Sequence, residues 1–115
     1  MTMEELYKNI NGDYEKAISR MQNDERIKKY LGFFLEDTSY EDLIKAMENN
    51  NCEDAFSAAH TLKGVSQNMA FDALSKVVEE ITEELRAKNF NIALELLPMV
   101  TKEYKVVIDE IKSII

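Results

Sequence analysis

The sequence predicts an all-α protein, an up-down-up-down four-helix bundle with additional short N-terminal helices. Apolar residues recur every three or four positions along most of the chain, which is the spacing of an amphipathic helix. The 115 residues include only three glycines and one proline, fewer than the turns of a β-rich fold would need. The last four predicted helices are long and their connections are short, which favours antiparallel packing of neighbours.

Two short helices are expected at the start of the chain. The first covers Met3 to Ile10, with Thr2 as its N-cap, and Asn11-Gly12 ends it. Asp13 caps the second, which reaches about Met21. We expect the N-terminal helices to cover one end of the bundle.

A third helix is expected to start at Asn23-Asp24. Its inward face should carry five side chains: Ile27, Tyr30, Leu31, Phe34 and Leu35. Gly32 lies inside this helix, where glycine is less favourable than alanine by about 1 kcal/mol. We therefore expect Gly32 to allow close packing against a neighbouring helix.

The first two bundle helices are separated by a run of asparagines. Ser39 and Asp42 have the spacing of a capping box, which predicts that a helix opens at Ser39. This helix should bury Leu43, Ile44 and Met47. Asn49-Asn50-Asn51 should end it, because asparagine tolerates left-handed backbone. The next helix is expected from about Glu53 to Asn68.

The last two bundle helices follow a junction at Phe71-Asp72. The first of them should extend to about Lys88, and the second from Ile92 to about Ser113. Pro98 lies inside the second, and proline removes a backbone hydrogen bond and clashes with the preceding turn. We expect either a kink at Pro98 or a break into two pieces.

Length and composition predict one domain, residues 1–115, with one hydrophobic core. The net charge of −8 argues against nucleic acid or an anionic membrane as a partner, because both would select a basic surface. No apolar run approaches the roughly 20 residues of a membrane span, and residues 1–5 do not show the basic and then hydrophobic pattern expected of a signal peptide. The single cysteine, Cys52, allows no internal disulfide. We expect a cytoplasmic protein, and the capped helix near Met1 favours a free-standing one over a domain of a larger kinase.

The only histidine, His60, lies in the middle of the helix predicted from Glu53 to Asn68. On a helical wheel it points roughly 140° from the centre of the core face. That face comprises Ala55, Ala59, Leu62, Ser66 and Met69. Lys63, Gly64 and Gln67 follow His60 at i+3, i+4 and i+7 and share its exposed side. A solvent-facing imidazole beside a lysine and a bare stretch of backbone suits a small anionic group carried on the imidazole.

The segment His60-Thr61-Leu62-Lys63-Gly64 resembles the H-x-L-K-G signature of histidine phosphotransfer (HPt) domains, which are helical bundles that carry a phosphoryl group on one histidine. The resemblance covers about Ile10 to Lys112. It includes Asn11-Gly12-Asp13 before an apolar-periodic run and Phe33-Phe34-Leu35 before a helix break. The family often has a glycine shortly after the motif, where this chain has Ala70. We expect Ala70 to be tolerated there with a negative φ.

The resemblance implies a phosphorelay function in two-component signal transduction. His60 would accept a phosphoryl group from a receiver-domain aspartate, or from a kinase, and pass it to another receiver. The implied partners are response-regulator receiver domains and a sensor histidine kinase. The chain has no glycine-rich phosphate loop, so we expect a monomeric phosphocarrier with no ATP-binding site or kinase activity of its own. No cofactor is implied, and Mg²⁺ is expected only on the partner receiver domain.

Three residues on the His60 face have expected supporting roles. Lys63 would neutralise phosphoryl oxygens as a point charge. Gly64 would leave room for the phosphate and for the partner, and Gln67 would donate an amide hydrogen bond.

Two further candidates lie on the following helix, because family members often place a polar or basic residue from it near the phosphohistidine. Arg86 and Thr82 are these candidates, although Arg86 equally fits a solvated helix-end residue stabilised by the helix dipole. Phe56, one turn before His60, fits either a docking surface or the edge of the core.

Two other interpretations compete with the phosphocarrier. A helical adaptor could bind a receiver or kinase without carrying phosphate, but the intact His60, Lys63 and Gly64 argue against it. An unrelated bundle with a chance motif would leave the unfavourable Gly64 unexplained. Metal binding is not indicated, because one histidine and Cys52 do not make a ligand set.

Overall fold

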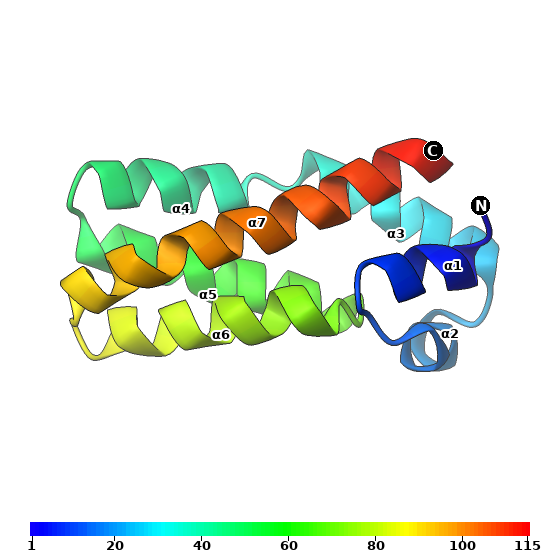
Figure 1. The fold of residues 1–115 in the computed structure, drawn as a ribbon, viewed down its shortest axis with the longest axis horizontal. Coiled ribbons are helices and arrows are strands. Elements are labelled where there is room, and N and C mark those ends of the chain that lie inside the picture. The colour runs from blue at the N-terminus through cyan, green and yellow to red at the C-terminus, as the bar shows by residue number, and fades with distance from the viewer.

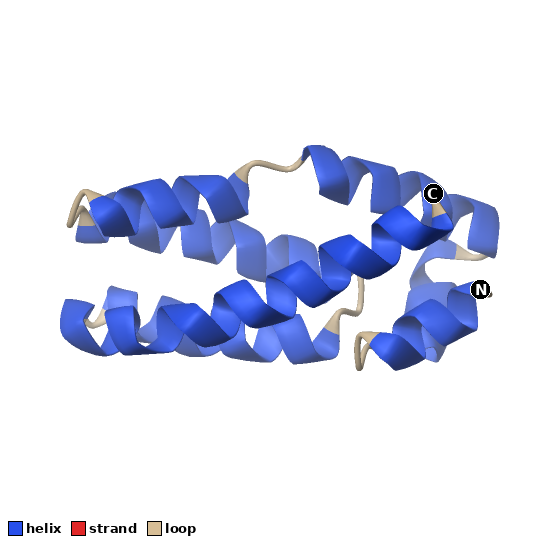
Figure 2. Ribbon diagram, turned by 45° about the horizontal axis from the view of Figure 1, so that its top comes forward, coloured by secondary structure: helices blue, strands red, loops and turns tan.

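The computed structural model describes residues 1–115 and contains seven α-helices and no strand (Figure 1, Figure 2). The helices are α1 Met3–Asn9, α2 Tyr14–Met21, α3 Asp24–Glu36, α4 Ser39–Glu48, α5 Cys52–Asn68, α6 Asp72–Arg86 and α7 Phe90–Ile114. Short loops join α4 to α7 into an up-down-up-down bundle, and α1 to α3 close one end of it, beside both termini (Figure 1). The predicted fold class is confirmed. None of the helices is both long and apolar enough to cross a membrane.

The helix starts follow the predicted caps with one exception. Thr2, Asp13 and Asn23 each accept a hydrogen bond from a backbone N–H in the first turn of the helix that follows. The capping box predicted at Ser39 is wrong, because Thr38 is the N-cap of α4 and its side chain makes no capping hydrogen bond. The carboxylate of Asp37 instead accepts from the backbone N–H of Ser39 at 2.9 Å.

Four helices end in the same hydrogen-bonded turn, the Schellman motif, and none of them uses glycine. The left-handed residues after α1, α4, α5 and α6 are Asn11, Asn50, Ala70 and Lys88, with φ between 54° and 64°. The expectation of a negative φ at Ala70 is wrong, since its φ is 58°. The motif explains why alanine adopts this unfavourable conformation: Ala70 and Phe71 donate to the carbonyls of Gln67 and Ser66, both at 3.0 Å.

Two glycines differ in how closely other atoms approach them. A Cβ on Gly12 would lie 2.8 Å from the carbonyl oxygen of Ala70 and 2.9 Å from a ring carbon of Tyr7, so the N-terminal turn can only pack there without a side chain. A Cβ on Gly32 would meet nothing within 4 Å. The expected close packing at Gly32 is therefore wrong.

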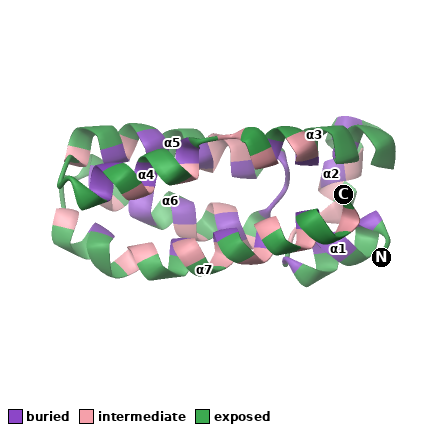
Figure 3. Ribbon diagram, turned by 90° about the horizontal axis from the view of Figure 1, so that it is seen from above, coloured by how far each residue is buried: buried purple, intermediate pink, exposed green.

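The core is one cluster of 28 buried residues on the inward sides of the helices (Figure 3). Six aromatic rings make a continuous series through it, each in contact with the next: Tyr14, Tyr7, Phe71, Phe34, Tyr104 and Tyr40. The series joins the N-terminal helices to α4 and α7. Tyr30 was expected to face inward but is 45% exposed, because it lies beyond the edge of the buried stripe of α3.

Hydrogen bonds also attach the N-terminal helices to the end of α5. The Tyr7 hydroxyl donates to the carbonyl of Met69 at 2.8 Å, and the backbone N–H of Asp13 donates to the carbonyl of Ala70 at 2.9 Å. The guanidinium of Arg20 donates to the carbonyl of Gln67. The Met69 and Ala70 carbonyls follow the last residue of α5, where the helix supplies no donor for them. The Gln67 carbonyl accepts from Arg20 in addition to Ala70.

The last helix is longer than predicted. It begins at Phe90 rather than Ile92 and continues to Ile114 without a break, with Pro98 inside it. Val100, Tyr104, Val107 and Ile111 form its buried stripe beyond the proline. Of the two alternatives at Pro98, a break into two pieces is wrong.

Candidate functional site

The helix α5 presents His60 to solvent from the middle of the bundle. All five residues of the predicted core face are buried: Ala55, Ala59, Leu62, Ser66 and Met69. His60 lies on the opposite side and is exposed. The small alanines on the inner face bring α5 close to its neighbours, while the outer face keeps its polar side chains. Helical periodicity alone therefore places the His60 side chain on the solvent side of α5.

The imidazole of His60 makes no hydrogen bond or ion pair with the rest of the chain. Its ring contact is with Phe56, one turn earlier on α5. The two ring centroids are 5.8 Å apart and the ring planes differ by 11°. Both ring nitrogens are thus without a competing partner in the protein.

The three residues predicted to share the His60 face are placed there by α5, in different environments. Lys63 is half-buried and forms no ion pair. A Cβ on Gly64 would meet nothing within 4 Å, so this glycine has no packing role. Gln67 is exposed, and its backbone carbonyl accepts from Arg20 while its side-chain amide makes no hydrogen bond. A cation, an open stretch of backbone and a free amide therefore follow His60 along α5.

The two candidates on α6 differ in burial, because Thr82 is buried and Arg86 is exposed. Thr82 is fully buried, and its hydroxyl donates to the carbonyl of Val78 at 2.6 Å. The expected role of Thr82 beside the phosphate is therefore wrong, because a hydroxyl buried where α6 packs against the bundle cannot contact a phosphate on an exposed imidazole. Arg86 is exposed, with its guanidinium carbon 4.9 Å from the centroid of Phe56 and its Nε donating to Glu83 at 2.9 Å.

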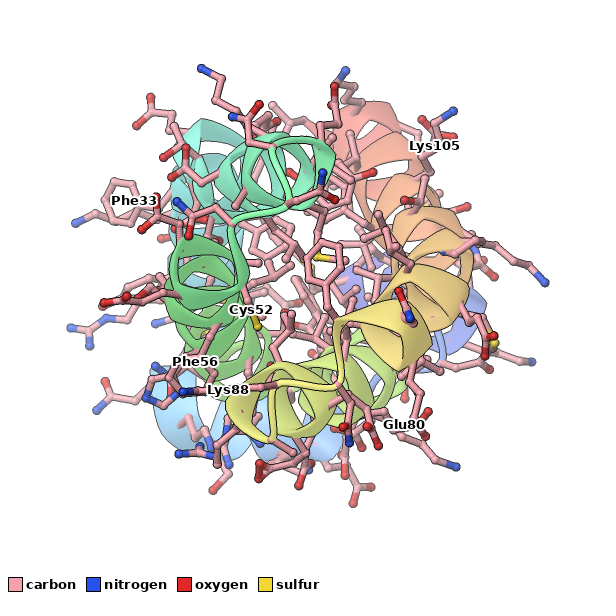
Figure 4. All side chains as sticks on the ribbon, turned by 90° about the vertical axis from the view of Figure 1, so that its left-hand side faces the viewer. Phe33, Cys52, Phe56, Glu80, Lys88 and Lys105 are labelled. Atoms are coloured by element: carbon pink, nitrogen blue, oxygen red, sulfur yellow. The ribbon has the colours of Figure 1, made fainter.

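The structure adds aromatic residues on the same side of the bundle. Figure 4 shows Phe33 and Phe56 projecting from one side, while Glu80 and Lys105 project elsewhere. Phe33 is 51% exposed and packs edge-on against Tyr30, with the Lys29 ammonium 5.9 Å from its ring centroid. The sequence pattern assigned Tyr30 to the core and so missed this exposed pair.

A polar groove runs along the other flank of α5, towards α4. It has a volume of about 470 Å³, and Asp42, Asp54, Ser57 and Thr61 are among the residues that line it. Its acidic residues do not converge, and no three metal-ligating side chains come together anywhere in the structure. The groove offers polar groups beside the His60 face but no assembled ion site.

A comparison with protein families identifies the fold family of this chain. The Hpt domain model matches residues 30–113, which is most of the chain and includes the whole of α4, α5 and α6. The chain belongs to the Hpt domain family. The match begins about twenty residues after Ile10, so α1 and α2 of this Hpt domain lie outside it. No curated protein and no solved structure matches the chain.

Proposed function

We propose that this Hpt domain is a histidine phosphocarrier of a two-component phosphorelay. In this proposal His60 accepts a phosphoryl group from a receiver-domain aspartate, or from a kinase, and passes it to another receiver. The observation that supports it most directly is an exposed imidazole, with no hydrogen bond or ion pair to the protein, at the histidine of the H-x-L-K-G motif. Hpt domains are phosphocarriers rather than kinases, which fits the absence of a glycine-rich phosphate loop in the sequence.

The proposed chemistry is a displacement at phosphorus. The unprotonated nitrogen of the neutral imidazole forms an N–P bond, the acyl-phosphate O–P bond breaks, and the aspartate leaves as a carboxylate with the electron pair. The other ring nitrogen keeps its proton. The cationic phosphoimidazole can then return the phosphoryl group to a second aspartate carboxylate by the reverse displacement. The transfer therefore requires the neutral form of the imidazole, because only an unprotonated nitrogen carries the attacking lone pair.

The neighbours of His60 support this transfer in different ways. Lys63 lies one turn further along α5 and, without an ion pair, is available to neutralise phosphoryl oxygens. Gly64 leaves open space for the phosphate and for the approaching partner. The free amide of Gln67 supplies a hydrogen-bond donor. Arg86 supplies a second cation from α6, held beside Phe56.

Further parts of the proposal concern the setting of the transfer. We propose that the partners are response-regulator receiver domains and a sensor histidine kinase, and that the Mg²⁺ needed for the transfer is held by the receiver. The protein is proposed to act in the cytoplasm, as a monomer and as one domain over residues 1–115. It uses no cofactor of its own in this scheme.

The test is phosphoryl transfer from a phosphorylated receiver to the wild type and to His60→Gln. The wild type should acquire an acid-labile label and the variant none. Because His60 is exposed and makes no hydrogen bond, the variant should keep the helical circular dichroism and the melting temperature of the wild type. A wild type that binds the receiver without acquiring label would identify an adaptor, and a fully labelled His60→Gln would place the acceptor elsewhere.

A further inference from the structure

We propose that Phe56 is a positioning residue that holds the imidazole of His60 in one orientation by stacking, and that Arg86 in turn holds the ring of Phe56. The inference rests on the proposed phosphocarrier function and adds a residue that the H-x-L-K-G motif does not contain.

The need for such a residue follows from the isolation of the imidazole. A functional histidine is commonly oriented by a hydrogen bond from its second ring nitrogen to a carbonyl or carboxylate. His60 has no such bond to the chain. On an exposed helix face two χ1 wells remain open to it, and its χ2 torsion is broad. Without another contact the ring would spread over several orientations.

The contact with Phe56 limits this freedom without blocking the reaction. The two rings are nearly parallel, at 11°, with centroids 5.8 Å apart, which is within the range of offset aromatic stacking. The nitrogen lone pair lies in the plane of the imidazole, at its edge. A ring stacked on one face therefore leaves the attacking edge open while it disfavours rotation about χ2.

Phe56 is itself held from two directions. It is half-buried and packs against the hydrophobic core on its inner side. The Arg86 guanidinium lies 4.9 Å from its ring centroid, and Glu83 binds the Nε of Arg86 at 2.9 Å. A residue of α6 thereby fixes the aromatic ring that orients a residue of α5. Figure 4 shows Phe56 projecting outward from the side of the bundle.

The expected effect lies in the chemical step rather than in receiver binding. Transfer requires the ring nitrogen to align with the phosphorus and the leaving oxygen, so each unproductive orientation lowers the rate. Losing one aromatic stacking contact should reduce the rate constant at saturating phosphorylated receiver by about three- to tenfold. The receiver concentration for half-maximal rate should change by less than about twofold, as expected for an interaction that does not bind the partner.

The experiment compares Phe56→Leu and Phe56→Tyr with the wild type. Phe33→Leu, which alters an exposed aromatic side chain on the same side of the bundle, is the matched control. Each protein is phosphorylated by a receiver and, separately, by the small donor phosphoramidate, which needs no docking. Proton–carbon NMR of the His60 ring reports the ring-current shift that a stacked Phe56 produces. Thermal melts confirm that each variant is folded.

The inference expects Phe56→Leu to slow both donors by the same factor and to move the His60 ring resonances towards those of an unstacked histidine. Phe56→Tyr, which keeps an aromatic ring, should retain the transfer rates and the His60 resonances of the wild type. Phe33→Leu should change neither the saturating rate nor the His60 resonances. Slower transfer from the receiver alone, with a raised half-saturation concentration, would make Phe56 a docking residue and overturn the inference. Unchanged His60 resonances in Phe56→Leu would overturn it as well.

These outcomes are distinguishable from failure of the phosphocarrier proposal. If neither donor labels the wild type, the proposed function fails and the role in transfer fails with it. If the wild type is labelled and Phe56→Leu is labelled equally fast by both donors, only the inference about Phe56 fails.

Discussion

The two helix-interior glycines, Gly32 and Gly64, offer a controlled test of why a glycine lies beside His60. Both lie inside helices, neither has a positive φ, and a Cβ on either would meet no atom within 4 Å. They differ in position, because Gly64 is one turn from His60 and Gly32 lies on α3. Substitution by alanine should therefore affect their stability alike, and bulkier substitution should affect transfer only at Gly64.

The stability effect can be worked from helix propensity. Alanine is favoured over glycine in a helix interior by about 1 kcal/mol, partly because glycine gives the unfolded chain more conformational freedom. With open space at both sites, Gly32→Ala and Gly64→Ala should each raise the free energy of unfolding by about 0.5–1 kcal/mol. For a chain of this size that is a rise in Tm of roughly 2–6 °C.

Gly12 provides the opposite case. A methyl group there would lie 2.8 Å from the carbonyl oxygen of Ala70, which is backbone and cannot move away cheaply. Gly12→Ala should lower the free energy of unfolding by about 1–3 kcal/mol. The same substitution thus has opposite signs at different glycines, because Gly32 and Gly64 lie in open helical positions and Gly12 lies in a crowded turn.

The assay combines urea unfolding, followed by circular dichroism, with rates of phosphoryl transfer from a phosphorylated receiver. Gly64→Gln should slow transfer by obstructing the approach to His60, whereas Gly32→Gln should leave the rate unchanged. A destabilising Gly64→Ala would show that the space beside Gly64 is not open. Equal rates for Gly64→Gln and the wild type would refute the idea that Gly64 keeps a path to His60 clear.

Two further predictions concern charge and pH. Lys63→Ala should change the free energy of unfolding by less than about 0.5 kcal/mol, because Lys63 forms no ion pair. It should still slow phosphoryl transfer, and the difference in rate from the wild type should shrink as the salt concentration rises. Equal transfer rates at low salt would contradict this prediction. Burial, with smaller effects from Glu41 and Asp37, raises the pKa of Tyr104 from 10.0 to about 12. The folded state therefore binds the phenol proton more tightly than the unfolded state does. The stability that this proton contributes is present below about pH 10 and is lost as the pH rises to about 12. Tyr104→Phe, which loses no hydrogen bond, should therefore lose less stability than the wild type in urea titrations across that range, by up to about 2 kcal/mol, and identical pH profiles would refute the assignment.

The elements were predictable where the signal is local. Apolar spacing located all seven helices, and caps such as Asp13 and Asn23 act within one turn of the residues they bond. The errors arise where hydrogen bonds, rather than apolar spacing, decide the local structure. Asp37 accepts the hydrogen bond at the start of α4 that was expected of Ser39. The positive φ of Ala70 belongs to the hydrogen-bonded turn after α5, where the Ala70 carbonyl also accepts from the backbone N–H of Asp13. Neither effect has a signal in periodicity.

In the candidate site, features set by a single helix were predictable from the sequence, whereas contacts between helices were not. The direction of His60 follows from the wheel of a single helix, and the wheel therefore placed it correctly. Thr82 and Arg86 lie one turn apart on α6, and only the packing of α6 against the bundle shows that the first is buried and the second exposed. The contact from Arg86 to Phe56 joins two helices, so the sequence could suggest each residue but not the pair.

The attachment of α1 and α2 to the end of α5 lies outside the part of the chain that matches the family. Residues 30–113 match the family. The three residues that donate hydrogen bonds to carbonyls at the end of α5, which are Tyr7, Asp13 and Arg20, lie outside that match. A graft of residues 30–113 onto a foreign N-terminal segment would carry His60 and its neighbours across, but it would lose the three hydrogen bonds that the N-terminal helices donate at the end of α5.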